Sequence, residues 1–177
     1  MSYSIQSSNP KFIISKCVLS NSSLDEAIEQ FFPLNTEVAI MNWNHIPIPL
    51  SYKYDISYMI MDVLGLIELL QNSNRGNMVI SWLPDTFRSD WNIKWDNGLI
   101  TIVSNWECTT GHIEYILNEN NVVTVTVDKF IVEWKSILET IVNCLNNNNC
   151  NEFNVVGFNT LIRIYNRING YGVLYRD

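Results

Sequence analysis

A cysteine and a histidine lie close together in the sequence at Cys108 and His112, with three residues between them. A thiol beside an imidazole can act as a nucleophile with its base, and the other histidine, His45, could complete a metal site with such a pair. The intervening "TTG" is typical of an ordinary turn, which favours a buried thiol and a surface imidazole. The sequence therefore predicts no metal, no cofactor and no catalytic residue here.

Two pairs of acidic residues have side chains that could also do chemistry. Asp85 and Asp90 lie in "LPDTFRSD", and Glu107 and Glu114 lie near a loop. Glycosidases use such pairs as acid and base or nucleophile, but acidic residues in loops are more often simply solvated. The sequence contains no glycine-rich phosphate loop, no G-x-S-x-G turn and no H-E-x-x-H helix. We therefore expect that the protein is not an enzyme.

The net charge points to a class of partner. The chain has 18 acidic and 11 basic residues, a formal charge of −7. Phosphate recognition requires a basic surface, so nucleic-acid binding is not expected. Residues 85–139 carry nine acidic and four basic side chains, so the acidic excess lies mainly in the middle of the chain. The same balance also serves solubility alone, and both interpretations stay open.

Length and composition predict one globular domain over residues 1–177. The chain is 47% hydrophobic and has no Gly-, Ser- or Pro-rich linker. Its longest apolar segment, Ile56 to Leu70, is shorter than the roughly 20 residues that a membrane helix needs. The N-terminus does not resemble a secretory signal, and the four cysteines are widely scattered, as is typical of reduced thiols. We therefore expect a cytoplasmic protein that does not bind membranes.

The first third of the chain predicts short strands and a helix. Lys11 to Leu19 is rich in β-branched residues and reads as a strand, and Ser23 with Glu26 has the spacing of a capping box for a helix that Pro33 ends. Glu37 to Trp43 predicts a second strand. Pro47 and Pro49 lack the N–H that a sheet requires, so "HIPIPL" is expected to be an extended connection.

A long helix should follow, with Asp55 as its N-cap. Apolar residues recur at helical spacing over positions 56–67, and further apolar residues flank them on both sides. We therefore expect a core helix that is buried on several sides, including Met61, Leu66 and Leu69.

The middle of the chain predicts strands. Met78 to Leu83 reads as one strand, and "Asn97-Gly98" predicts a two-residue hairpin turn. This register pairs Trp95 with Ile100, Ile93 with Ile102, and Trp91 with Ser104. The three side chains Trp91, Trp95 and Trp106 are then expected on one buried face, with a mixed, half-exposed face opposite.

A second hairpin and two helices complete the chain. Pairing Ile113, Tyr115 and Leu117 with Val127, Val125 and Val123 predicts a hairpin around "NENN". A helix is expected from Asp128, its N-cap, to the asparagine run, and another over Phe158 to Ile168. "GYGVLYR" can form a closing strand. This order of elements predicts an α+β fold, with an antiparallel sheet of hairpins packed against several helices.

The segment from "WDNGLITIVSNWE" through a hairpin into the helix with Phe130, Trp134 and Leu138 resembles immunity proteins of bacterial polymorphic toxin systems, including contact-dependent growth inhibition. The resemblance covers roughly residues 80–146. It implies a cytoplasmic protein that binds the C-terminal toxin domain of a sibling's effector, often a nuclease, and masks its active site without catalysis. It implies no particular interface residue.

An acidic protein fits that role because nucleases need a basic groove for phosphate, and opposite charge speeds encounter. We expect the contact surface to consist of acidic residues on loops and exposed strand faces, namely Asp85, Asp90, Asp96, Glu107, Glu114 and Glu119.

Two other classes of function stay open. A small enzyme would have a deep pocket with converging polar groups and displaced pKa values. A structural or self-associating protein would expose an apolar patch, for which Trp43 and Trp82 are candidate anchors.

Overall fold

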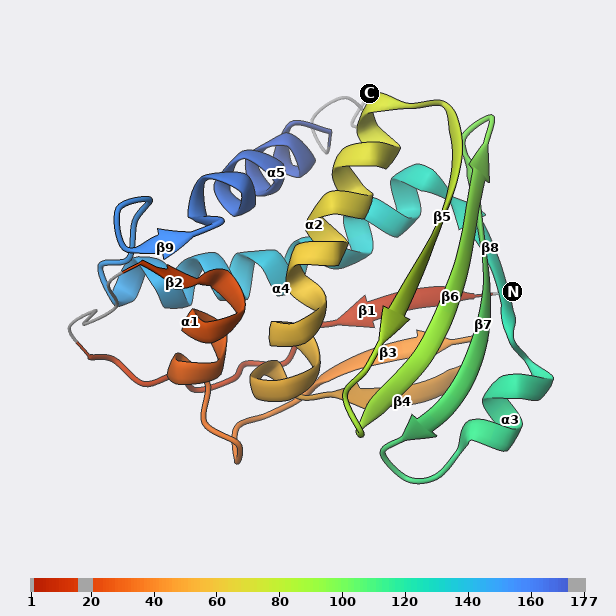
Figure 1. Ribbon diagram of the computed structural model, residues 1–177, viewed down its shortest axis with the longest axis horizontal. Coiled ribbons are helices and arrows are strands. Elements are labelled where there is room, and N and C mark those ends of the chain that lie inside the picture. The colour runs from red at the N-terminus through yellow and green to blue at the C-terminus, as the bar shows by residue number, and fades with distance from the viewer. Residues whose placement is uncertain (1, 16–20, 172–177) are drawn as a thin grey trace.

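Five helices and two antiparallel sheets form the computed structural model of this protein, which describes residues 2–15 and 21–171 (Figure 1). The predicted α+β class is confirmed, and the buried apolar side chains join into one core. The helices are α1 (Leu24–Phe31), α2 (Ser57–Asn72), α3 (Glu114–Glu119), α4 (Val127–Asn147) and α5 (Phe158–Tyr171), and a π-helical turn, η1 (Tyr52–Ile56), precedes α2. None of these helices is both long and apolar enough to cross a membrane.

The strands form one sheet of four, one of three and a short parallel pair. The four-stranded sheet has the order β5 (Arg75–Trp82), β6 (Phe87–Asp96), β7 (Leu99–Thr109) and β8 (Val122–Thr126). The three-stranded sheet has the order β1 (Tyr3–Gln6), β3 (Ala39–Trp43) and β4 (Ile46–Leu50), and β2 (Ser22–Ser23) pairs with β9 (Val155–Val156).

The hairpin between β6 and β7 has the predicted register. Trp95 lies opposite Ile100, and Trp91 lies opposite Ser104. Asn97 and Gly98 both have positive φ, at 49° and 78°, as a type I′ turn requires. The tryptophans on this face are buried, including Trp106, so the predicted alternation of buried and exposed residues is confirmed.

An aromatic cluster joins the two larger sheets. The ring of Trp43 on β3 lies 5.3 Å, centroid to centroid, from the ring of Trp91 on β6 and 5.3 Å from that of Trp106 on β7. Trp82 stands edge-on to Trp91 at 5.5 Å. Trp43 and Trp82 are 0% and 1% exposed, so their interpretation as anchors of a self-associating patch is wrong. They fill the core instead.

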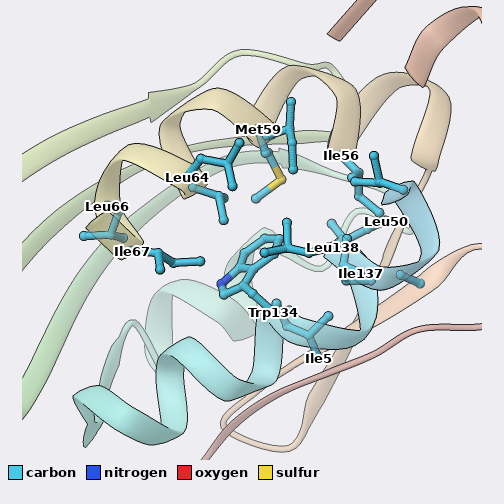
Figure 2. Packing of buried hydrophobic residues seen from close by; sticks show 14 of the residues in the cluster. Ile5, Leu50, Ile56, Met59, Leu64, Leu66, Ile67, Trp134, Ile137 and Leu138 are labelled. Atoms are coloured by element: carbon cyan, nitrogen blue, oxygen red, sulfur yellow. The ribbon is translucent and has the colours of Figure 1, made fainter. Parts of the chain in front are cut away.

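The helices cover the remaining sides of this core. Figure 2 shows α2 lying over α4, with Trp134 of α4 pointing toward Leu64 and Ile67 of α2. In the same view Ile5 of β1 lies below Trp134, and Leu50 of β4 lies at the right of the cluster, beside Ile56. The α2 stripe is buried as predicted, but Met61 and Leu69 are 44% and 45% exposed, so burial on several sides was wrong for these two residues.

The second predicted hairpin is wrong. Residues 114–119 form α3, and β8 pairs with β7, which places Val125 opposite Ile100 and Val123 opposite Ile102. Val123 and Val125 therefore meet apolar partners as expected, but on a strand that already had one neighbour. Asn118 holds α3 against β7. Its side chain accepts a hydrogen bond from the Trp106 amide at 2.9 Å and donates one to the Trp106 carbonyl at 2.9 Å.

The predictions for the N-terminal third are corrected in two places. Residues 11–15 form no strand, and the rest of the predicted strand, 16–19, lies outside the described residues. Pro47 and Pro49 belong to β4, which has only β3 as a neighbour. Prolines are tolerated on such an edge because their missing N–H groups have no strand to bond there.

Two predicted helix caps are also wrong. Asp55 lies inside η1, because the helical segment begins five residues before α2. The N-cap of α4 is Thr126, whose hydroxyl accepts from the Lys129 amide at 3.2 Å, and Asp128 lies in the first turn. The capping box of Ser23 and Glu26 at α1 is confirmed. Of "GYGVLYR", residues 170–171 continue α5 and the others lie outside the described residues.

Candidate functional site

A groove of about 550 Å³ opens between α1, the first turns of η1 and α2, and the loop from β5 to β6. We call it the acidic groove, because three of its lining side chains are carboxylates and no lysine or arginine is among the described residues that line it. Its lining residues are Asp25, Glu29, Tyr54, Ser57, Tyr58, Leu83, Pro84, Asp85 and Thr86.

Helix α1 contributes two of the carboxylates. The backbone amide of Ser23 donates to Glu26 Oε2 at 2.9 Å, which fixes the first turn of the helix. Asp25 and Glu29 then lie four residues apart, so they project from the same side of α1. Glu26 is occupied by the cap, whereas the carboxylates of Asp25 and Glu29 accept no hydrogen bond within the described part of the chain. They are therefore open to a ligand.

The opposite wall is aromatic. Tyr54 and Tyr58 are 43% and 49% exposed and, being four residues apart, stand one above the other along η1 and α2. The Lys53 Nζ atom lies 5.8 Å from the centre of the Tyr54 ring and donates to the Glu29 carbonyl at 2.7 Å. The ammonium group of Lys53 is thus already held at the rim of the groove, against the ring of Tyr54.

Asp55 holds the third wall in place from below. The Thr86 hydroxyl donates a hydrogen bond to Asp55 Oδ1, and the Ser51 amide donates to Oδ2 at 2.7 Å. Burial raises the pKa of the Asp55 carboxyl, and these two hydrogen bonds oppose that rise. Because Asp55 is only 1% exposed, it positions the loop that carries Asp85 and does not itself face the groove.

Asp85 is the one lining carboxylate with an ion-pair partner. Its side chain pairs with Arg88 and is 86% exposed. Exposed ion pairs of this kind contribute little to stability, about 0–1 kcal/mol, so a partner can replace Arg88 at small cost.

The structure divides the six predicted contact residues among three places. Only Asp85 lies in the acidic groove. Asp90, Asp96 and Glu107 lie on the outer face of the four-stranded sheet, away from the core. Glu114 and Glu119 lie at opposite ends of α3.

The outer sheet face carries both signs of charge. Asp90 and Asp96 are six residues apart on β6, about 20 Å at 3.4 Å per residue. Lys94 lies between them on the same face, and Arg75 of β5 is the direct cross-strand neighbour of Asp96. The Asp90 carboxylate accepts a hydrogen bond from the Ser81 hydroxyl at 2.5 Å. These acidic residues therefore do not form one continuous negative surface.

The two acidic residues of α3 differ in their surroundings. Glu114 Oε1 accepts from the Thr109 amide at 2.5 Å and from the Thr109 hydroxyl at 3.1 Å. Its own backbone amide, and then these bonds, hold the pKa of the Glu114 carboxyl below its usual range. Glu114 thus fixes the turn before α3, while Glu119 is exposed at the helix end.

The interpretation of the sequence missed four groove residues: Asp25, Glu29, Tyr54 and Tyr58. Each pair has the four-residue spacing that places side chains on the same side of a helix, and this signal was readable. The sequence could not show that the two pairs face the same groove, because this depends on how α1 packs against α2.

In the described part of the chain, Cys108 and His112 belong to no group of His, Cys, Asp or Glu side chains that could hold a metal ion. Cys108 is half-buried on β7 and His112 lies exposed in the following turn, with a φ of 53°. Cys108 and Cys144 are free thiols, and Cys17 lies outside the described residues.

The acidic groove combines separated negative charges with two open aromatic faces, an arrangement that can accommodate a cationic side chain and its alkyl stem. Such a lining repels an anion such as phosphate. No protein-family model, no curated protein and no solved structure matches this chain.

Proposed function

We propose that this protein is a non-catalytic immunity protein of the cytoplasm, which binds the toxin domain of a cognate effector and masks the toxin's active site. The observation that carries the proposal is the acidic groove, where three carboxylates and two half-exposed tyrosines face one space without a lining lysine or arginine. The resemblance over roughly residues 80–146 and the net charge of −7 support it.

The chemistry of the groove favours a nuclease as the target. Nucleases hold phosphate with lysine and arginine side chains, and such a basic surface is complementary to Asp25, Glu29 and Asp85. Tyr54 and Tyr58 add flat apolar area that packs against the alkyl part of a lysine or the plane of an arginine. The overall negative charge attracts the toxin before contact.

This proposal moves the main contact surface from the sheet to the groove. Asp85 is both one of the six residues predicted from the sequence and a residue of the groove. Asp90, Asp96 and Glu107 share their face with Lys94 and Arg75, and the groove carboxylates have Lys53 and Arg88 beside them, so the aromatic lining of the groove is what distinguishes it from the sheet face.

Co-expression with a candidate toxin tests the function directly. The candidate is the C-terminal domain of a large secreted protein encoded immediately upstream of this chain. We expect this domain to arrest growth when it is expressed alone, and the co-expressed chain to restore growth and to co-purify with it. Arrest without rescue, together with no complex in calorimetry, would reject the pairing.

Matched charge reversals test the surface. In the groove variant, Asp25, Glu29 and Asp85 are each replaced by lysine. The control variant carries Asp96→Lys, Glu107→Lys and Glu119→Lys and therefore has the same net charge. We expect the groove variant to bind the toxin domain at least about 100-fold more weakly, with a smaller salt dependence, because close interfacial charge pairs contribute several kcal/mol.

The control variant should lose only the long-range attraction, about tenfold or less at physiological salt. If the control variant instead bound the toxin domain more weakly than the groove variant did, the contact surface would include the outer sheet face and not the groove. Circular dichroism of both variants checks that each still folds.

A further inference from the structure

Three of the four outer strands in the two larger sheets have a specific device that closes their edge. On β4 the device is a pair of prolines, Pro47 and Pro49. On β1 the Ile5 amide donates to the Glu133 carboxylate at 2.9 Å. On β8 the Asn44 side chain donates to the Val122 carbonyl at 2.7 Å. Such devices prevent an edge from pairing with another chain.

Strand β5 has one such contact in the described chain, at its first residue, where the Ser73 hydroxyl donates to the Arg75 carbonyl at 2.6 Å, and residues 76–82 have none. It is an outer strand with β6 as its only neighbour, and it runs for eight residues, Arg75–Trp82, without a proline (Figure 1). Beyond β6, no described side chain is hydrogen-bonded to the backbone of residues 76–82. Val79 on its outer face is 63% exposed. A long open edge of this kind is a template for one more strand.

We infer that β5 pairs antiparallel with β5 of a second copy of this chain, so that the two four-stranded sheets become one continuous sheet. The outward residues must stay on the same face across the new junction, because the side-chain period of a strand is two. The register that places Met78 opposite Met78 of the second copy satisfies this condition. It also places Arg75 opposite Ser81 of the second copy.

Charge complementarity selects this register. Ser81 is the cross-strand neighbour of Asp90 on β6 and donates its hydroxyl hydrogen bond to that carboxylate at 2.5 Å. Arg75 of one copy therefore lies two strands from Asp90 of the other, on the same face. Two strand spacings are about 10 Å, a distance that an arginine and an aspartate side chain span together. Twofold symmetry repeats the pair, so the interface gains two arginine–aspartate contacts.

Arg75 has Asp96 as its direct cross-strand neighbour but forms no ion pair with it in the described chain. It is exposed, and the ion pairs of the described chain join other residues, namely Arg88 with Asp85, Lys129 with Glu133, and Arg163 with Glu68. An extended peptide from another protein could also add to β5, but the chain shows no feature that selects its sequence. A second copy supplies both the strand and the opposite charge, so it is the occupant that the observations favour. This inference does not depend on the proposed function.

A charge swap tests the register. Light scattering coupled to size exclusion should show a dimer of the wild type. Arg75→Glu and Asp90→Arg should each raise the dissociation constant at least tenfold, because each places like charges together at both symmetric sites. Mixing equal amounts of the two variants should restore the dimer, since the mixed pair has opposite charges at both sites. Lys94→Glu makes the same charge change as Arg75→Glu on the same face, away from the proposed pair, and should leave the dimer intact.

A disulfide provides a second measurement that does not depend on charge. Met78→Cys places two thiols directly opposite each other across the junction, and oxidised glutathione should convert this variant to a covalent dimer. The wild type and Asn92→Cys, on the neighbouring strand, should stay uncrosslinked under the same conditions.

A wild-type monomer at all concentrations would overturn the inference. A dimer that the two charge variants leave unchanged, or one that Met78→Cys does not crosslink, would overturn it as well. In the latter cases the chain would associate through another surface.

Discussion

The hydroxyl of Thr86 donates a hydrogen bond to the buried carboxylate of Asp55, and this contact joins the loop between β5 and β6 to the π-helical turn η1. The two residues are 31 positions apart. Asp55 is buried, whereas Thr86 lines the acidic groove. The geometry of the groove thus depends on a polar contact beneath its surface.

Thr86→Val removes this hydroxyl while conserving the shape of the side chain. We expect the free energy of unfolding in urea to fall by about 1.5–3 kcal/mol, the usual range for a hydrogen bond to a charged group. Thr101→Val is the matched control, because its hydroxyl contacts only the Thr124 hydroxyl on the half-exposed outer face. The control should change stability by less than about 1 kcal/mol. Equal effects of the two substitutions would contradict the role of Asp55.

The raised pKa of Asp55 predicts a pH dependence with a definite sign. The folded state holds the proton more tightly than the unfolded state, so the stability that protonated Asp55 contributes is complete below the unfolded pKa, about 3.9. It is lost as the pH rises through the higher folded pKa. Asp55→Asn cannot titrate, so the stability difference, wild type minus Asp55→Asn, should be larger at pH 3.5 than at pH 7. Urea unfolding at both pH values measures it, and a difference that grows with pH would refute the assignment.

Gly76 and Gly65 should respond in opposite directions to substitution by alanine. A Cβ at Gly76 would lie 2.3 Å from Cζ2 of Trp95, whose indole is buried and held by a 3.0 Å hydrogen bond to the Ser73 carbonyl. Gly76→Ala should therefore destabilise the protein by about 1–3 kcal/mol. A Cβ at Gly65, inside α2, meets nothing within 4 Å. Gly65→Ala should stabilise by about 0.5–1 kcal/mol, because alanine is the better helix former. Thermal unfolding of the two variants would show whether the signs differ.

Asn148 anchors the N-terminal segment to the end of α4. It is buried, accepts from the Ser15 amide at 2.7 Å, and donates to the carbonyls of Ile13 and Cys144 at 3.0 Å each. Asn148→Ala removes all three bonds, and within the described chain only the Cys144 carbonyl keeps another partner, the Asn148 amide, so the substitution should cost about 1–3 kcal/mol. Asn147→Ala is the control, since Asn147 is exposed and its side chain bonds only the Asn143 carbonyl. Limited trypsin digestion should cleave after Lys11 faster in the first variant than in the second.

The sequence by itself determined the elements whose signals are local. The Asn97-Gly98 turn set the register of β6 with β7, because the turn geometry leaves one pairing available. Capping-box spacing located the start of α1, and helical periodicity located α2, α4 and α5. It also gave the acidic balance that underlies the proposed function.

Only the tertiary structure decided which partners these elements meet. The valines of β8 fit any apolar strand face, so their pattern could not choose β7 over residues 113–117. The same is true of the groove, which forms where Asp25 and Glu29 of α1 meet Tyr58 of α2 and the loop at Asp85. Apolar burial is non-directional, so a residue pattern fixes which face is buried but not what covers it. That choice is made by the packing of distant segments.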